Sequence, residues 1–323
     1  MRAIRIHETG GPEVMKLEEI DLPQPAAGEV RVKQHAIGIN FVDTYFRKGF
    51  YPTPPMPYTP GGESAGEVVE VGRGVKNFKP GDRVACVAGQ GAYAEERNVP
   101  AQGLFKLPRD VSYETAAAMM LKGLTAQYLL RQTYRVKEGD FILVHAAAGG
   151  VGQILCQWGR ALGARVIGTV GSPEKAKIAK KAGAQHTILY REEDFAKRVE
   201  EITKGKKCPV VYDGVGKATF PASLDCLAPL GLFVSYGSAS GGIEAFNLGL
   251  LAQKGSLFAT RPTLFTFLSD PARAEKMARE LFRTVKSGAV TVQIGRRFPL
   301  AEAAEAHRAL EARETTGSII LAP

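Results

Sequence analysis

The stretch FILVHAAAGGVGQ, residues 141–153, passes from bulky apolar residues to a run with almost no side chains. Its first part, FILVHAA, predicts a buried strand. The following GVGQILCQWGRALGA predicts a helix, because its apolar residues recur at spacings of three and four. The glycines therefore lie where a strand turns into a helix, which is where a dinucleotide fingerprint has to lie. A tight turn before a buried helix is the alternative.

The glycine template G-x-G-x-x-G aligns on Ala147, Gly149 and Gly152. Gly149 would let the backbone approach a pyrophosphate, and Gly152 would let the helix pack tightly on the strand. Free N–H groups at the helix start, at Gly150 and Val151, would bind the phosphates. Because the first template position is alanine, the motif alone does not separate a dinucleotide site from a packing turn.

Strands and helices alternate from residue 140 onward, and this context favours dinucleotide binding. The predicted strands after the first are RVIGTV, HTILY, PVVYDGVG, GLFVSYG and SLFATRP. The predicted helices between them are SPEKAKIAKKAGA, EEDFAKRVEEITKG and SLDCLAPLG, the first with Ser172 as N-cap and Pro173 at its first position. This order calls for a doubly wound parallel sheet with helices on both faces, an α/β Rossmann domain.

The first hundred residues have a different character and look β-rich. Gly and Pro punctuate the β-branched runs EVRVKQHAIGIN, GESAGEVVEVG, PGDRVACVAG and VPAQGLFKLP. Residues 51–62 are too rich in proline for a sheet interior and are expected to form an irregular loop. A helix with Ser112 as N-cap follows, and the last sixty residues predict two further helices and a final strand.

Length, charge and cysteine usage limit the function classes. A chain of 323 residues is more often two domains than one, and a net charge of +9 suits an anionic ligand. The basic runs at residues 175–181 and 204–207 are expected to be a solvated helix face and a loop, and nucleic-acid binding is not expected. No apolar run reaches the roughly 18 residues of a membrane span. The N-terminal residues lack the pattern of a signal peptide, and none of the four cysteines forms a CxxC pair. A reduced, cytoplasmic protein is therefore expected.

The run GDFILVHAAAGGVGQILCQWGR, residues 139–160, closely resembles the signature of quinone oxidoreductases. These form the zeta-crystallin-like, zinc-free branch of the medium-chain dehydrogenase/reductase superfamily. Further matching motifs are HETGGPEVMKLEE, AIGINFVDTYFRKGFYP, LKGLTAQYLL, VVYDGVG and ETTGSIILAP. The resemblance implies a β-rich, GroES-like catalytic domain, residues 1–124 and 263–323, that encloses a Rossmann cofactor-binding domain, residues 125–262.

Zinc alcohol dehydrogenases share this superfamily, and their pattern has a Cys before a Thr-Asp pair and a Gly-His-Glu after it. Here Asn40 stands at the Cys position and Gly62 at the His position. A catalytic zinc needs three protein ligands, and Glu63 cannot hold the ion alone. We therefore expect a zinc-independent reductase in which Glu63 is structural.

Without a metal, another group must polarise a carbonyl or donate a proton. Asn40 offers an amide donor, and Tyr45 and Tyr51 offer phenolic donors on rings that could pack on a flat substrate. The resemblance places Asn40 and Tyr45 beside the nicotinamide and Tyr51 at the substrate mouth. The alternative is that both tyrosines pack under the proline-rich loop. Asp43 is expected to cap backbone or to pair with Lys48 or Lys122.

The resemblance also assigns cofactor contacts outside the glycine turn. Lys122 and Thr125 would meet the nicotinamide ribose and amide, and Arg313 would be a C-terminal cofactor contact or an ordinary surface arginine. Independently of the resemblance, Tyr236, Gly237 and Ser238 follow the end of a predicted strand, where ligands lie in doubly wound sheets, and are further candidate contacts. His145, on an apolar strand, is expected to be a satisfied structural residue.

The end of the second strand, RVIGTV, favours NADPH over NADH. NAD-preferring sites carry a carboxylate there, about 20 residues beyond the glycines, whereas this strand ends in Gly171 and Ser172. Ser172, Lys175 and Tyr190 could all bind a 2′-phosphate. Glu174 lies close by and would oppose it unless its side chain points away.

Three functions therefore remain open. The leading one is NADPH-dependent reduction of a quinone or another electron-poor acceptor. The second is reduction of an enal or enoyl thioester on the same scaffold, and the third is a non-catalytic, NADPH-holding structural or RNA-binding protein. The late apolar strands GLFVSYG and SLFATRP lie near a predicted sheet edge, so we also expect a homodimer through the Rossmann domains.

Overall fold

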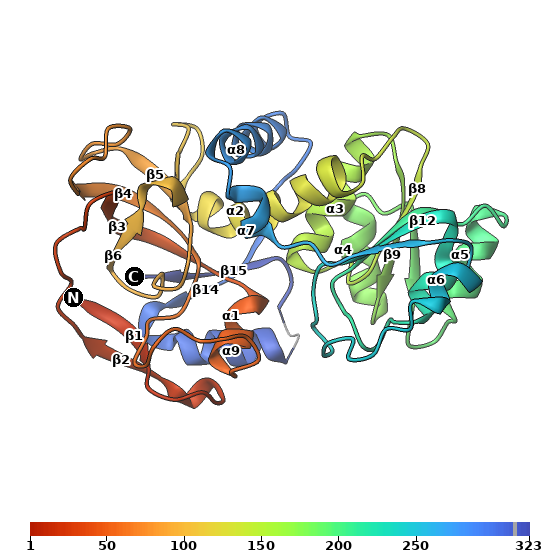
Figure 1. Cartoon of the computed structure of the whole chain (residues 1–323), viewed down its shortest axis with the longest axis horizontal. Coiled ribbons are helices and arrows are strands. Elements are labelled where there is room, and N and C mark those ends of the chain that lie inside the picture. Colours follow the sequence, from red (N-terminus) through yellow and green to blue (C-terminus); the bar gives the residue numbers. More distant parts are fainter. Residues whose placement is uncertain (313–314) are drawn as a thin grey trace. The chain divides into compact units, whose positions relative to one another are not determined.

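The computed structural model describes residues 1–312 and 315–323. The chain forms two compact units (Figure 1). The first contains residues 1–121 and 292–323, and the second contains residues 122–291. Helix α2 (Tyr113–Tyr128) begins in the first unit and ends in the second, where one π-helical turn (Leu129–Thr133) continues it. Ser112 caps α2 as predicted, because its Oγ accepts the N–H of Thr115 at 3.1 Å.

The second unit is built on a six-stranded sheet in which every neighbouring pair is parallel. The strands are β8 (Phe141–Val144), β9 (Arg165–Val170), β10 (His186–Leu189), β11 (Cys208–Asp213), β12 (Leu227–Ser235) and β13 (Phe258–Thr260). Their order is β10-β9-β8-β11-β12-β13, which is the doubly wound order with its switch point between β8 and β11. The predicted Rossmann domain is confirmed.

After β8, β9 and β10, the helices of this unit follow the strands in the predicted alternation, whereas α6 (Gly249–Gln253) was not predicted. The other helices are α3 (Gly150–Ala161), α4 (Pro173–Lys181), α5 (Phe195–Thr203), α7 (Leu264–Leu268) and α8 (Pro271–Lys286). Helix α3 buries Ile154, Leu155 and Trp158 on one face. Ser172 caps α4 by accepting the N–H of Lys175 at 3.4 Å, as predicted.

The predicted helix at residues 223–231 is wrong. The structure has only a short 3-10 turn (Ala222–Cys226), after which β12 begins at once. Leu227 already pairs with Cys208 of β11, and Pro229 lacks the N–H that a helix would need there. Strand pairing therefore ends the turn.

The first unit is β-rich, as expected. One sheet has the order β14-β15-β3-β4-β5-β7, with β6 also paired to β3, and β1 and β2 form a separate hairpin-like pair. The strands are β1 (Arg2–Ile6), β2 (Met15–Glu19), β3 (Glu29–Ile39), β4 (Glu63–Val71), β5 (Arg83–Val87), β6 (Glu96–Pro100), β7 (Leu104–Lys106), β14 (Ile294–Pro299) and β15 (Ser318–Ala322). Two helices, α1 (Phe41–Arg47) and α9 (Ala303–Glu311), and short 3-10 turns at Pro12–Val14, Ala101–Gly103 and Leu300–Glu302 complete the unit.

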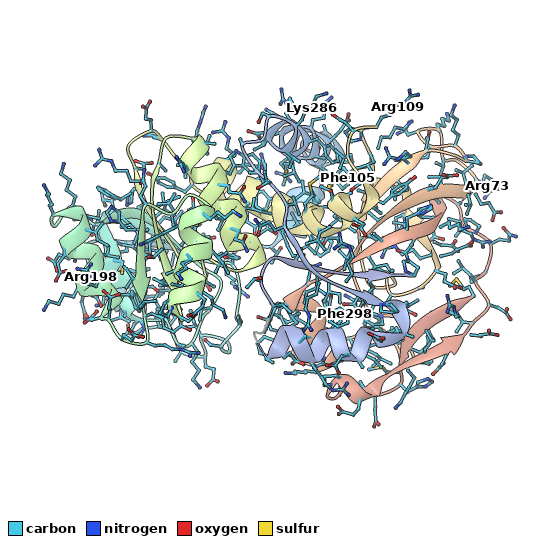
Figure 2. All side chains as sticks on the ribbon, turned by 180° about the vertical axis from the view of Figure 1, so that it is seen from behind. Arg73, Phe105, Arg109, Arg198, Lys286 and Phe298 are labelled. Atoms are coloured by element: carbon cyan, nitrogen blue, oxygen red, sulfur yellow. The ribbon has the colours of Figure 1, made fainter. Side chains whose placement is uncertain are left out.

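Strand β14 was not predicted from the sequence, which has a polar GRR in this segment. It forms by pairing in parallel with β15, and its Phe298, labelled in Figure 2, is buried in the core with Ile37 and Leu321. The proline-rich loop at residues 51–62 is irregular, as predicted, apart from one bridge between Tyr58 and Ile6.

The compact units differ from the predicted segments at residues 263–291, which pack in the second unit and not with the C-terminal segment. The rings of Tyr128 and Phe267 stack at 4.4 Å, and Arg131 pairs with Glu280 of α8 at 3.0 Å. These contacts of α7 and α8 with the end of α2 explain the difference. Among the described residues, no helix is both long and apolar enough to cross a bilayer.

Candidate functional site

The glycine turn between β8 and α3 has the geometry of an anion-binding site. Gly149 is the N-cap of α3 with extended backbone, and within the described residues no side chain caps this helix. Its first N–H groups are therefore left for a ligand. A Cβ at Gly152 would lie 2.3 Å from the carbonyl oxygen of Ala146 and 2.8 Å from the Cα of Ala147, so only glycine fits. The tight packing predicted for Gly152 is present, and the turn is a candidate pyrophosphate site.

Lys122 lies against this turn. A Cβ added to Gly150 would lie 2.9 Å from the Cδ of Lys122, so the lysine stem crosses the first residue of α3. Lys122 and Thr125 are buried, each 7% exposed, and they lie nearly one turn apart on α2. The structure thus brings a positive charge to the predicted phosphate turn, which Val151 and the glycines around it form.

A second predicted subsite lies directly after β9, at Gly171 and Ser172. A Cβ at Gly171 would lie 3.0 Å from Tyr190 Oη and 3.5 Å from Arg191 Nε. Tyr190 therefore reaches the strand end as predicted, and Lys175 follows in the first turn of α4. Arg191 was missed in the sequence, although it directly follows Tyr190 and carries the charge that a phosphate subsite needs.

Glu174 also lies at this subsite, where its side chain contacts Ser172. The side chain is exposed, and hydrogen bonds from the backbone N–H of the helix start and from the Ser172 side chain lower its pKa. Its carboxylate thus stays ionised beside the residues that would bind a 2′-phosphate. The structure therefore contains the negative charge that, according to the sequence, would oppose a 2′-phosphate at this subsite.

The loops after β11 and β12 approach each other closely. A Cβ at Gly237 would lie 2.5 Å from the carbonyl oxygen of Gly214, and the ring of Tyr236 packs on Gly214. Arg261 holds the second loop by donating to the carbonyl of Gly237 at 3.0 Å and to Ser238 Oγ at 3.2 Å. The three predicted residues at this strand end therefore form one braced segment.

A buried network lies under these loops. His145 contacts Thr169 Oγ1 at 2.8 Å through Nδ1 and Ser223 Oγ at 3.0 Å through Nε2. Ser223 donates to Asp213 Oδ2 at 3.1 Å, and Asp213 Oδ1 accepts the N–H of Val215 at 2.7 Å. Burial lowers the pKa of His145, which keeps its ring neutral. The histidine is a satisfied structural residue, as expected.

In the first unit, Asn40 lies where β3 turns into α1. Its Nδ2 donates to Glu63 Oε2 at 2.7 Å, and Glu63 Oε1 accepts the N–H of Leu121 at 2.7 Å. Glu63 is fully buried and thus holds Asn40 and α2 together. Asp43 accepts the backbone N–H of Asn40 at 2.8 Å, the capping role that the sequence predicts, whereas Lys48 pairs with Glu311.

The predicted tyrosines belong to a cluster of rings around the start of the proline-rich loop. Tyr45 meets Phe41, Phe50 and Tyr51 edge-on, with ring centroids 5.2–5.6 Å apart. Phe50 stacks on Tyr51 at 5.4 Å and is 53% exposed. Both tyrosines therefore pack within this cluster of rings, and Phe50 is a further aromatic residue of the cluster that was not predicted from the sequence.

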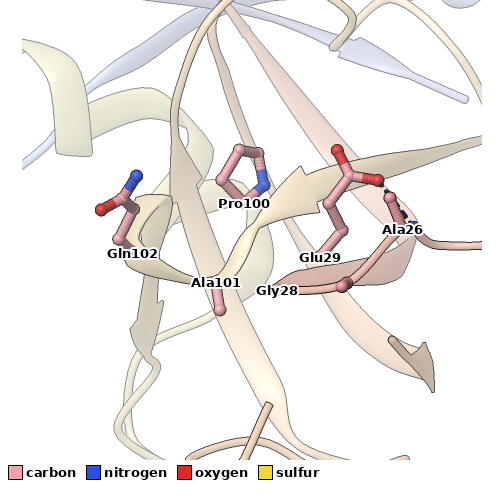
Figure 3. A pocket seen from close by; sticks show the side chains of 7 residues that line it. Ala26, Gly28, Glu29, Pro100, Ala101 and Gln102 are labelled. Atoms are coloured by element: carbon pink, nitrogen blue, oxygen red, sulfur yellow. Dashed lines mark hydrogen bonds between the residues drawn. The ribbon is translucent and has the colours of Figure 1, made fainter. Parts of the chain in front are cut away.

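A surface pocket of about 490 Å³ also lies on the first unit (Figure 3). It is lined by Ala26, Ala27, Gly28, Glu29, Pro100, Ala101 and Gln102. Glu29 begins β3, whereas Asn40 follows the other end of the same strand. At a rise of about 3.3 Å per residue, the two are roughly 35 Å apart along the strand. The pocket is therefore separate from Asn40 and the residues that hydrogen-bond with it.

The described residues do not suit a metal ion. No group of three or more His, Cys, Asp or Glu side chains comes together among residues 1–312 and 315–323. All four cysteines are free and buried, and burial raises the pKa of Cys156 and Cys208 to about 12. Such thiols are poor zinc ligands. Arg313, the predicted C-terminal cofactor contact, lies outside the described residues.

Comparison with known proteins places this geometry in context. Residues 26–109 match the family model of the alcohol dehydrogenase GroES-like domain, and residues 150–283 match that of the zinc-binding dehydrogenases. The chain is 53% identical to a quinone oxidoreductase of Pseudomonas aeruginosa over all of this chain and 99% of that protein. It is 47% identical to a 2-haloacrylate reductase of a Burkholderia species over 98% of each chain. The crystal structure of Escherichia coli quinone oxidoreductase complexed with NADPH superposes with a TM-score of 0.98 at 49% identity, covering all of both chains.

Proposed function

Because the chain belongs to the quinone oxidoreductase family of medium-chain dehydrogenases/reductases, we propose that it reduces quinones with NADPH in the cytoplasm. The observation that carries this proposal is the glycine turn of the second unit, whose Gly152 has no room for a side chain. When bound, NADPH supplies the hydride that the acceptor receives. The protein supplies binding, orientation and polarisation.

Cofactor binding is assigned to the second unit. The N–H groups at Gly150 and Val151 would bind the pyrophosphate, Gly149 would let the backbone approach it, and Lys122 would add a charge beside them. The braced segment at residues 236–238 lies at a strand end of the same sheet, where ligands bind in doubly wound folds. Arg313 remains a proposed contact from the sequence.

The preference for NADPH rests on the end of β9. Ser172, Lys175, Tyr190 and Arg191 offer two cationic groups and two hydroxyls within one small region. A doubly charged 2′-phosphate gains from both cations, whereas the uncharged ribose diol of NADH does not. Glu174 reduces this gain by its like charge.

Action on the acceptor is assigned to the first unit. An Asn side-chain amide has two N–H donors, and among the described residues Asn40 uses one of them, toward Glu63. Tyr45 and Tyr51 add phenolic groups on rings that can pack against a planar quinone. These donors would stabilise negative charge that develops on a quinone oxygen during reduction, in place of a metal ion.

The similarity to a 2-haloacrylate reductase favours a second candidate function. The same donors could polarise the carbonyl of a conjugated acid or enal, and the hydride would then reach a carbon–carbon double bond. The choice between the two depends on the acceptor, because the cofactor chemistry is shared.

A panel of acceptors tests the proposed function. NADPH oxidation is measured spectrophotometrically with 1,2- and 1,4-quinones, conjugated enals and 2-haloacrylate, after dialysis against a strong chelator. We expect quinones to be reduced and the chelator to have no effect. Preferential turnover of haloacrylate would support the second candidate, and loss of activity with stoichiometric zinc would contradict the metal-free site.

Lys175→Ala tests the assignment of the 2′-phosphate subsite. Affinity for NADPH should fall by about 10- to 150-fold, the range of one charge-assisted hydrogen bond. Affinity for NADH should hardly change, because it lacks the phosphate. Fluorescence titration measures both, and Lys180→Ala, an exposed lysine in the last turn of α4, is the matched control. Equal losses for both cofactors would show that Lys175 supports the fold.

Tyr45→Phe separates the catalytic role from packing. The phenylalanine ring keeps the edge contacts with Phe41, Phe50 and Tyr51, so only the hydroxyl is lost. We expect kcat to fall for several quinones while the Kd for NADPH stays the same, since the hydroxyl acts on the acceptor. Steady-state kinetics and cofactor titration measure the two quantities. An unchanged kcat would assign Tyr45 to packing alone.

The edge of the parallel sheet supports the proposal of a homodimer. Strand β13 ends the sheet order, and its Phe258 is 59% exposed. An exposed apolar edge strand tends to pair with another chain. Light scattering at micromolar concentration should therefore give twice the monomer mass, and Phe258→Lys should shift the mass toward the monomer. A monomeric parent protein would contradict the proposal.

A further inference from the structure

A buried chain of hydrogen bonds crosses the first unit from helix α9 to helix α1. At its outer end, Arg47 donates to Glu311 Oε2 at 2.8 Å through Nη2. The Nη1 of the same guanidinium lies 2.8 Å from His307 Nδ1. Arg47 and His307 are fully buried, although Arg47 is a charged residue of α1 and His307 belongs to the C-terminal segment.

The inner half of this chain ends at Asn40. His307 Nε2 lies 2.9 Å from Tyr93 Oη, and Tyr93 Oη donates to Asp43 Oδ2 at 3.0 Å. The same carboxylate oxygen accepts the backbone N–H of Asn40 at 2.8 Å. Tyr93 is fully buried and Asp43 is 1% exposed. The chain therefore joins α9 to the residue that begins α1, through side chains that water does not reach.

The chemistry of the groups sets the direction of every bond. Arginine only donates, so His307 Nδ1 must accept from Arg47. Burial and the nearby Arg47 charge lower the pKa of His307 to about 3, so its ring is neutral and carries its one hydrogen on Nε2. That hydrogen is donated to Tyr93, whose own hydrogen then points to Asp43. Burial and Asp43 raise the pKa of Tyr93 well above its usual value, so this donor is never lost.

This directionality excludes a proton relay and leaves a positional role. The outer end is a guanidinium that stays protonated in proteins, so no proton can enter the chain there. Asp43, in contrast, depends on the donors that reach it. Because it accepts both the Tyr93 hydroxyl and the Asn40 N–H, its orientation sets the first turn of α1.

We propose that His307 and Tyr93 are positioning residues that hold Asn40 and the Tyr45 ring in place for the acceptor, through Asp43. This inference rests on the proposed function for its kinetic consequence. Tyr45 lies five residues beyond Asn40 on the same short helix, so a shift of the first turn moves the ring as well. The C-terminal helix α9 thereby takes part in acceptor reduction without touching the acceptor.

The test compares single and double variants. Tyr93→Phe removes one hydroxyl and should lower kcat by roughly 10- to 100-fold, as small displacements of positioned groups do, with little change in the Kd for NADPH. His307→Leu should cost the same, and the double variant no more than either single one, because both cut one chain. His307→Gln, which keeps an acceptor and a donor, should restore most of the activity.

A matched control and a readout besides activity make the test decisive. Tyr134→Phe removes a tyrosine-to-carboxylate bond of 3.1 Å, to Asp140 of the second unit, and should leave kcat unchanged. Hydrogen exchange of the Asn40 amide should accelerate in Tyr93→Phe, while amides of the central strand β4 keep their rates. This second measurement stands even if the parent protein reduces no quinone, an outcome that would refute the proposed function alone.

Three results would overturn the proposal. The first is an unchanged kcat per folded molecule of Tyr93→Phe together with unchanged exchange of the Asn40 amide. The second is additive losses in the double variant, which would mean that the two residues act separately. A drop in Tm without a change in kcat would assign the chain to stability only and would also refute the proposal.

Discussion

Helix α3 packs so closely on the turn after β8 that position 152 has no room for a Cβ, and the site of the second unit depends on this contact. In the described part of the chain no side chain caps the start of α3, so its first N–H groups stay available to a ligand. The parallel strands beside β8 then bring their carboxyl ends to the same edge. Gly171 and Tyr236 lie in the candidate site because they follow the carboxyl ends of β9 and β12 at this edge.

Buried carboxylates organise the segments that carry the candidate residues in both units. Asp213 accepts backbone N–H groups of the loop after β11 and the hydroxyls of Thr219 and Ser223. Asp43 and Glu63 do the same for the start of α1 and for Asn40. A buried carboxylate is costly unless its oxygens are fully hydrogen-bonded, so each one orders the groups around it. The buried polar residues outside the candidate site therefore order the segments that carry it.

Sequence reasoning succeeded where a local rule applied. The apolar runs at β8, β9 and β11, the caps at Ser112 and Ser172 and the glycines of the turn follow from periodicity, capping and close packing. It failed where a distant partner decided the outcome. Strand β14 exists because β15 pairs with it, and the predicted helix at residues 223–231 gives way to pairing of Leu227 with Cys208.

By itself, the sequence determined the α/β class, the glycine turn and the absence of a carboxylate at the tip of β9, since each is a property of neighbouring residues. Only the tertiary structure decided that Arg191 joins Tyr190 at that tip, and that Glu174 stays beside it. It also decided that His307, more than 200 residues away in sequence, contacts Tyr93 and so connects to Asp43. Such contacts carry no local signal, because burial and hydrogen-bond partners are set by how distant segments pack, not by spacing along the chain.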